Sequence, residues 1–198
     1  MKLELIVPNS WNDVSIKRFQ EFNKVSELDI PERQKLIKII STLCDVEEKM
    51  IEKLRMKDLK EIVSEINKLD RETAEKGSLK KIVDFKGKKY GFIPNMSEMT
   101  TGEYIDLESS CTADAMENLH TIMAILYRPL VGKPNKHGQY NIEPYQPTQQ
   151  KENDMLDFPM DISLKAVNFF FRLGLALMKD LNKSMKKVKQ KKLQMKAL

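Results

Sequence analysis

Residues 79–95 read LKKIVDFKGKKYGFIPN, and this stretch decides the fold class. Apolar and polar residues alternate on both sides of Lys86-Gly87-Lys88, which is the pattern of a β-hairpin with glycine in its turn. Pro94-Asn95 closes the second strand. Because a lone hairpin is only marginally stable, we expect a third strand, and the alternating residues Met1–Val7 are the candidate.

Helical patterns flank the hairpin on both sides. Ser10 with Asp13 and Thr100 with Glu103 have capping-box spacing, and Asp114 is expected to cap a further helix. Apolar residues recur at helical intervals after each of these positions. The sequence therefore predicts a mainly α protein with a small antiparallel β-sheet (α+β): a helical bundle, a hairpin and a long C-terminal helix.

We divide the chain into three parts. Residues 1–130 are predicted to form a mainly helical domain that includes the small sheet. Residues 131–160 hold four of the eight prolines and show no helical period, which predicts an extended Pro-rich loop, called the arm from here on. Residues 161–198 are predicted to form one long amphipathic helix with a basic tail.

An apolar stripe runs along this final helix. Its members alternate at spacings of three and four residues, the repeat by which helices pack on one another. They are Leu164, Val167, Phe171, Gly174, Met178, Leu181, Met185 and Val188. Before Met178 further apolar residues widen the stripe, so we expect that half to be buried. The second half is expected to project and to bind a partner through Leu181, Met185 and Val188.

The positive charge of the chain is concentrated in its tail. Residues 179–198 hold eight lysines and one acid, so this tail carries +7, while the whole chain carries +5 and the remainder −2. Three interpretations stay open: a solvated terminus, a partner-binding helix with lysines at its rim, and a segment that binds nucleic-acid phosphates. The lysines that would contact phosphates are Lys183, Lys186, Lys187, Lys189, Lys191 and Lys192.

The sequence lacks the common motifs of catalysis and metal binding. His120 and His137 lie far apart, and Cys44 and Cys111 lack the spacing of metal ligands. Neither a phosphate-binding glycine loop nor a nucleophile elbow occurs. We therefore expect no enzyme, no metal and no cofactor, and we expect both cysteines to be reduced.

We also expect the chain to be neither exported nor embedded in a membrane. Residues 1–8 have too short an apolar run for a signal peptide. The most apolar stretch, residues 162–178, is interrupted by Lys165, Asn168 and Arg172. It is also shorter than the ~20 residues that a membrane-spanning helix needs.

Four stretches resemble small proteins from the structural gene clusters of tailed bacteriophages, notably the crAss-like phages of Bacteroides. They are WNDVSIKRFQEF at residues 11–22, GKKY at 87–90, MTTGEYIDLE at 99–108 and IMAILYRP at 122–129. The resemblance covers roughly residues 1–130. It implies a non-enzymatic component or chaperone of virion assembly, and it transfers no functional residues.

We accordingly expect a virion structural or assembly protein that contacts other proteins in the portal, tail or baseplate region. It would act in the host cytoplasm during assembly, or in the virion, as an oligomer or part of a larger complex. Tyr140, Ile142 and Tyr145 are the expected anchors of an arm that orders only on a partner. The alternative is a nucleic-acid-binding protein that uses the lysine-rich helix, and a small enzyme with a carboxylate pocket is a third hypothesis.

Overall fold

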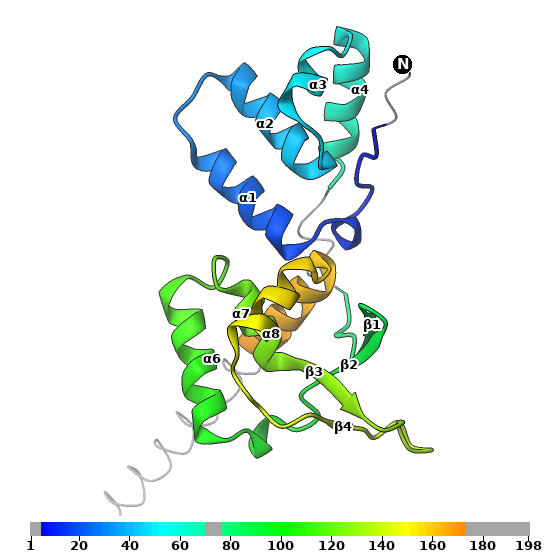
Figure 1. Cartoon of the computed structure of the whole chain (residues 1–198), viewed down its shortest axis with the longest axis vertical. Coiled ribbons are helices and arrows are strands. Elements are labelled where there is room, and N and C mark those ends of the chain that lie inside the picture. Colours follow the sequence, from blue (N-terminus) through cyan, green and yellow to red (C-terminus); the bar gives the residue numbers. More distant parts are fainter. Residues whose placement is uncertain (1–4, 70–76, 173–198) are drawn as a thin grey trace, which may run out of the picture.

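The computed structural model describes residues 5–69 and 77–172, and these residues are mainly helical with one small antiparallel sheet. The predicted α+β class is therefore confirmed. Figure 1 shows helices α1 to α4 gathered in one group, and the sheet with α6, α7 and α8 in a second group beneath it.

The first group begins with the predicted capping box, but this box caps a shorter element than expected. Ser10 and Asp13 cap the 3-10 helix η1, Trp11–Asp13. The next helix starts after a second cap, where the Ser15 hydroxyl accepts the Arg18 N–H at 3.3 Å. The helices of this group are α1 (Ile16–Glu27), α2 (Glu32–Cys44), α3 (Glu48–Glu52) and α4 (Met56–Ile66).

The sheet belongs to the second group and has the strand order β1-β2-β3-β4, with each neighbouring pair antiparallel. The strands are β1 (Ile82–Phe85), β2 (Lys88–Phe92), β3 (Tyr127–Val131) and β4 (Asn141–Ile142). Lys86 and Gly87 join β1 to β2 with φ angles of 47° and 75°. The predicted hairpin is thus confirmed, since positive φ at both turn residues matches the twist of paired strands.

The predicted third strand is wrong for the part that the structure describes. Residues 5–7 lie outside the sheet, where Leu5 and Val7 pack against a small core under α2 to α4. The strand next to the hairpin is β3 instead. The sequence did not predict β3, because this strand contains Pro129. Proline lacks an N–H and therefore argues against a central strand. The Pro129 carbonyl accepts the Glu143 N–H at 2.9 Å.

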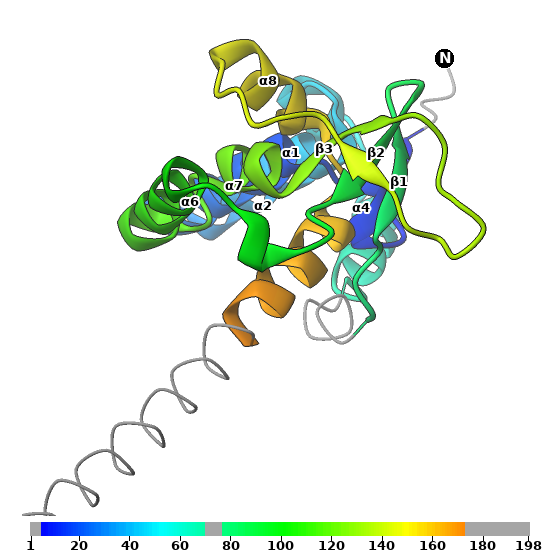
Figure 2. The same ribbon diagram turned by 90° about the horizontal axis from the view of Figure 1, so that it is seen from below.

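The other helices of the second group lie mostly to one side of the sheet (Figure 2). They are η2 (Met96–Glu98), α6 (Thr101–Asp114), α7 (Leu119–Leu126), α8 (Gln149–Asp154), η3 (Met155–Asp157) and a helix over 160–172. The capping box of Thr100 and Glu103 opens α6 as predicted. Asp114 ends α6, and its carboxylate accepts two backbone N–H groups in the turn before α7.

Two clusters of buried apolar side chains hold the described residues together. The larger cluster joins both groups: Val14 and Ile16 from the first group pack with Leu119, Tyr127 and Phe158 from the second. The smaller cluster lies under α2 to α4 and is built on Ile40, Cys44, Ile51 and Ile62. Burial of this apolar surface is the main favourable contribution to folding.

A backbone pairing far apart in sequence also joins the two groups. The Ile16 N–H donates to the Phe158 carbonyl at 3.0 Å, and the Met160 N–H donates to the Val14 carbonyl at 2.9 Å. Ser15 and Pro159 form the isolated bridge between these bonds. The end of the arm is therefore a structural part of the N-terminal group.

The helix over 160–172 follows the predicted stripe only in part. Leu164 and Val167 are buried in the larger cluster, as expected. Phe169 and Phe171 are 39% and 46% exposed, so the expectation that the whole first half is buried is wrong. The Phe169 ring meets Phe92 edge-on, with centroids 5.6 Å apart. The stripe from Gly174 onward lies outside the described residues.

Candidate functional site

The arm contacts the sheet of its own chain. The Tyr140 hydroxyl lies 2.8 Å from the Phe92 carbonyl and 3.1 Å from the Lys81 carbonyl, both acceptors for its proton. Ile142 belongs to β4 and pairs with Leu130 of β3. The expectation that the arm orders only on a partner is therefore corrected. The prolines of the arm exclude a long helix. The arm is nevertheless ordered on its own chain, because its tyrosines form hydrogen bonds within the molecule.

Gly91 makes this docking sterically feasible. A Cβ atom at this position would lie 2.5 Å from a ring carbon of Tyr140 and 2.9 Å from a methyl carbon of Ile142. Only glycine leaves room for so close an approach within a strand. Two of the three arm residues singled out from the sequence therefore pack over one position of β2.

The third arm residue, Tyr145, is tied to α6. Its hydroxyl donates to the Asp106 carboxylate at 2.7 Å. Burial, and then the hydrogen bond and negative charge of Asp106, raise the pKa of Tyr145. The ring also lies 6.0 Å from the Arg128 guanidinium carbon, within cation–π range. This tyrosine thus links the arm to both α6 and β3.

A buried ion pair fixes α6 to the sheet beside that contact. Arg128 Nη1 lies 2.7 Å from Glu103 Oε1, and the two side chains are only 12% and 4% exposed. Glu103 is also the capping-box partner of Thr100, whose N–H donates to the other carboxylate oxygen at 2.6 Å. One carboxylate therefore accepts from a helix cap and from a strand residue at once. Removal of either partner would leave the other as an uncompensated buried charge.

Beneath the arm lies a cavity of about 160 Å³. Ala124 and Ile125 of α7 line one side, and Tyr90 and Pro129 line the sheet side. The arm lines it with Glu143, residues 145–148, Lys151, Glu152, Asp154 and Met155, and Arg128 also belongs to its wall. An engineered cavity of similar volume, ~150 Å³, accepts benzene in another protein. The space therefore fits one compact group of ring size.

Charged side chains also line this cavity. Lys151 and Glu143 lie 3.8 Å apart, and the Thr121 hydroxyl donates to Glu152 at 3.3 Å. Burial raises the pKa of Tyr90, and the negative charges of Asp154 and Glu143 raise it further. The cavity thus combines apolar walls with carboxylates, which suits a ligand that carries both an apolar body and N–H groups.

The helical face next to the ion pair is apolar and exposed. Glu103 and Leu107 of α6 point inward and are buried, whereas Tyr104 and Ile105 are each 52% exposed. Side chains one and two positions apart in a helix point in different directions. The same turn of α6 is therefore held against the sheet through Glu103 and exposes Tyr104 and Ile105 on its other side. This turn presents two large apolar side chains from a rigid base.

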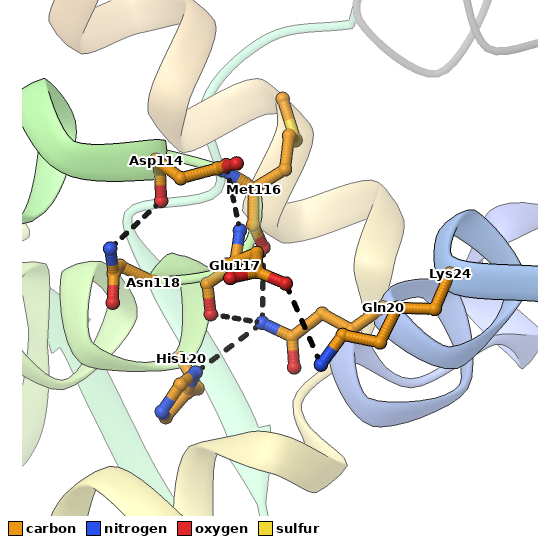
Figure 3. Close-up of polar contacts among 7 residues, drawn as sticks. All are labelled: Gln20, Lys24, Asp114, Met116, Glu117, Asn118 and His120. Carbon is orange, nitrogen blue, oxygen red and sulfur yellow. Dashed lines mark hydrogen bonds and ion pairs between the residues drawn. The ribbon is translucent and has the colours of Figure 1, made fainter. Parts of the chain in front are cut away.

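A polar contact between α1 and the start of α7 joins the two groups on another side (Figure 3). The Gln20 amide nitrogen donates to the carbonyls of Met116 and Glu117 at 3.0 and 2.7 Å. It also lies 3.4 Å from His120 Nδ1. Burial lowers the pKa of His120, while the negative charge of Glu152 opposes this effect. The contacts of His120 fit a structural role.

The remaining predicted partner and phosphate contacts lie outside the described residues. These residues are Leu181, Met185, Val188, Lys183, Lys186, Lys187, Lys189, Lys191 and Lys192. Within residues 5–69 and 77–172, no helix is long and apolar enough to cross a bilayer. The same residues contain no group of His, Cys, Asp or Glu side chains that could hold a metal ion.

The sequence did not point to the pairing of Glu103 with Arg128 or to the cavity. The sequence predicts only a capping role for Glu103. No residue near Arg128 in the sequence indicates that Arg128 forms an ion pair with α6. Gly91 was the one available signal, since a glycine inside a strand often marks the close approach of another segment. No protein-family model, curated protein or solved structure matches this chain.

Proposed function

We propose that this chain is a non-enzymatic structural or assembly protein of a tailed bacteriophage, acting through protein–protein contacts in the portal, tail or baseplate region. The phage-like stretches described above support the setting. The observation that carries the proposal is the turn of α6 that exposes Tyr104 and Ile105 while Glu103 is anchored to Arg128. Preorganised aromatic and aliphatic side chains lose little entropy on binding and commonly anchor interfaces.

The test is complementation of a phage from which the gene for this chain has been deleted. Wild-type protein should restore infectious particles, and Ile105→Asp should fail to do so while it remains folded. Val131→Asp is the matched control, because Val131 is 56% exposed but lies at the end of β3. Normal particles without the chain, or full rescue by Ile105→Asp, would contradict the proposal.

The stripe residues Leu181, Met185 and Val188 are proposed as a second contact on the same partner or on another copy. Leu181→Asp or Met185→Asp, with every lysine kept, should then weaken assembly. Under this proposal the protein acts in the host cytoplasm during assembly and stays in the virion if its contacts persist. Mass spectrometry of purified particles separates those two outcomes.

The alternative, nucleic-acid binding, is favoured by a single observation, the net +7 of residues 179–198. Contacts to phosphates release counterions, so affinity should then fall steeply as salt rises and disappear when Lys183 to Lys196 are deleted. Binding to duplex DNA that survives Lys-to-Gln exchange throughout the tail would exclude this mode.

A further inference from the structure

The charges of the second group are separated between two of its sides. Residues 96–126, which include α6 and α7, hold six acids and no lysine or arginine, a net charge of −6. Residues 77–95 and 127–142, which include the four strands, hold eight cations and one acid, a net charge of +7. Figures 1 and 2 both show α6 on one side of this group and the β3–β4 loop, residues 132–140, on the other. The group is therefore strongly dipolar.

The acidic side includes the exposed turn of α6. Glu108 follows Tyr104 by four residues and Ile105 by three, so the three side chains are neighbours on the helix surface. All three are exposed. No cation of the part of the chain that the structure describes forms an ion pair with Glu108. We call Tyr104, Ile105 and Glu108 the α6 face, which combines two large apolar side chains with an unpaired carboxylate.

The opposite side presents lysines at the start of β1 and on the β3–β4 loop. The Tyr140 hydroxyl lies 3.1 Å from the Lys81 carbonyl, which holds the base of the loop beside β1. Two backbone N–H groups of the loop donate to the Asn135 side chain at 2.9 Å each, so the loop has a fixed shape. Lys81, Lys133 and Lys136 are exposed and form no ion pair with any described carboxylate. We call these three lysines the loop face.

We propose that this protein associates head to tail with further copies of itself, the loop face of one copy binding the α6 face of the next. The two faces have opposite charge but lie on opposite sides of one molecule, so they meet only between two molecules. The alkyl part of a lysine covers apolar side chains such as Tyr104 and Ile105 while its ammonium reaches Glu108. This inference rests on the proposed function for the α6 contact, and it names the partner as a second copy.

A contact between two different faces has a consequence for assembly size. Each added copy leaves one free face of each kind, so the chain of copies grows until it closes into a ring or continues as a filament. Like charges oppose the contact of two loop faces or of two α6 faces, which leaves the head-to-tail contact as the favoured one. Because both faces are exposed, added salt should weaken the association.

The experiment measures the solution mass of the full chain by analytical ultracentrifugation, at low and at high salt. Wild type should form species larger than the monomer at low salt. Glu108→Lys and Lys136→Glu should each weaken this association about tenfold or more, because each places like charges across the contact. The combined variant, Glu108→Lys with Lys136→Glu, should regain association, because the reversed charges are again opposite.

Two substitutions in the first group are matched controls. Glu27→Lys and Lys53→Glu make the same changes of net charge at exposed positions that form no ion pair with a described residue. Both should associate like wild type. Circular dichroism of every variant separates weakened association from loss of folding. A monomeric wild type at low salt, or a combined variant that associates no better than the single ones, would overturn the proposal.

The basic tail is the competing source of lysines for the α6 face. A full-length variant with glutamine at all six of its predicted phosphate-contacting lysines should associate like wild type. Loss of association in that variant would assign the α6 face to the tail and overturn the role of the loop face. A monomeric wild type combined with failed complementation by Ile105→Asp would instead mean that the α6 turn binds a different protein. Self-association would then be wrong while the proposed function stood.

Discussion

The ring of Tyr140 occupies the space in which a side chain at Gly91 would begin. The separation of 2.5 Å between that ring and a Cβ at position 91 is shorter than real Cβ contacts. Leu130 and Ile142 crowd the same point at 2.9 Å, so the arm and β3 both depend on this glycine.

Gly91→Ala should lower the free energy of unfolding by about 1–3 kcal/mol, the range for an extra carbon forced into a packed site. Chemical denaturation measures the loss. Gly102→Ala is the control, because the nearest side-chain atom there is 4.0 Å away and no strained φ is involved. That substitution should be neutral or stabilising. Equal stability of the two variants would show that the arm does not pack on β2 as described.

Glu103→Ala should destabilise the protein by about 3 kcal/mol, because it leaves Arg128 as an uncompensated buried charge. Arg128→Ala should cost a similar amount for the same reason. The double variant should lose clearly less than both single losses added, which a double-mutant cycle measures. Glu108→Ala on the exposed side of α6 should change stability by less than about 0.5 kcal/mol.

The Cys44 thiol should resist alkylation in the folded protein. Burial raises its pKa to about 11, although the positive charge of Arg18 opposes the effect. At about pH 8 only about one thiol in a thousand would be thiolate, the reactive form. Mass spectrometry after iodoacetamide treatment measures this, with the denatured chain as the fast-reacting control. Modification of the native protein at the denatured rate would contradict the buried position of Cys44.

Acidification should destabilise the fold through His120. Its pKa in the folded state lies below the ordinary value of 6.5, so the unfolded chain binds the proton more readily. The free energy of unfolding should therefore fall as pH drops from 6.5 toward the folded pKa. Glu152 limits the size of the effect.

An NMR titration of the His120 ring measures that pKa directly. His120→Gln removes the titrating ring and should therefore remove this part of the pH dependence below the ordinary histidine pKa of 6.5. A measured pKa at or above 6.5 would contradict the prediction.

The local features of the fold could be predicted from the sequence, because neighbouring residues determine them. The turn at Lys86 and Gly87 and the capping box of Thr100 and Glu103 both follow from short-range chemistry. The third strand could not be predicted, since β3 contains Pro129 and its partner β2 comes from a distant segment.

The candidate site escaped prediction for the same reason. Tyr145 was identified as an anchor, but its partner Asp106 lies 39 residues away. No sequence pattern indicates that Arg128 and Glu103 form an ion pair. The cavity forms only when α7, the sheet and the arm pack together. Contacts of this kind depend on topology, which apolar periodicity alone does not specify.

The pairing of residues 14–16 with residues 158–160 has a consequence for synthesis on the ribosome. Helices α1 to α4 emerge early, yet Val14 and Ile16 reach their backbone partners only after Phe158 and Met160 have left the exit tunnel. Contacts of such long sequence separation slow folding, and apolar surface stays open in the meantime. Nascent chains that stall within the arm should therefore attract chaperones, whereas chains released beyond residue 167 can close their main core.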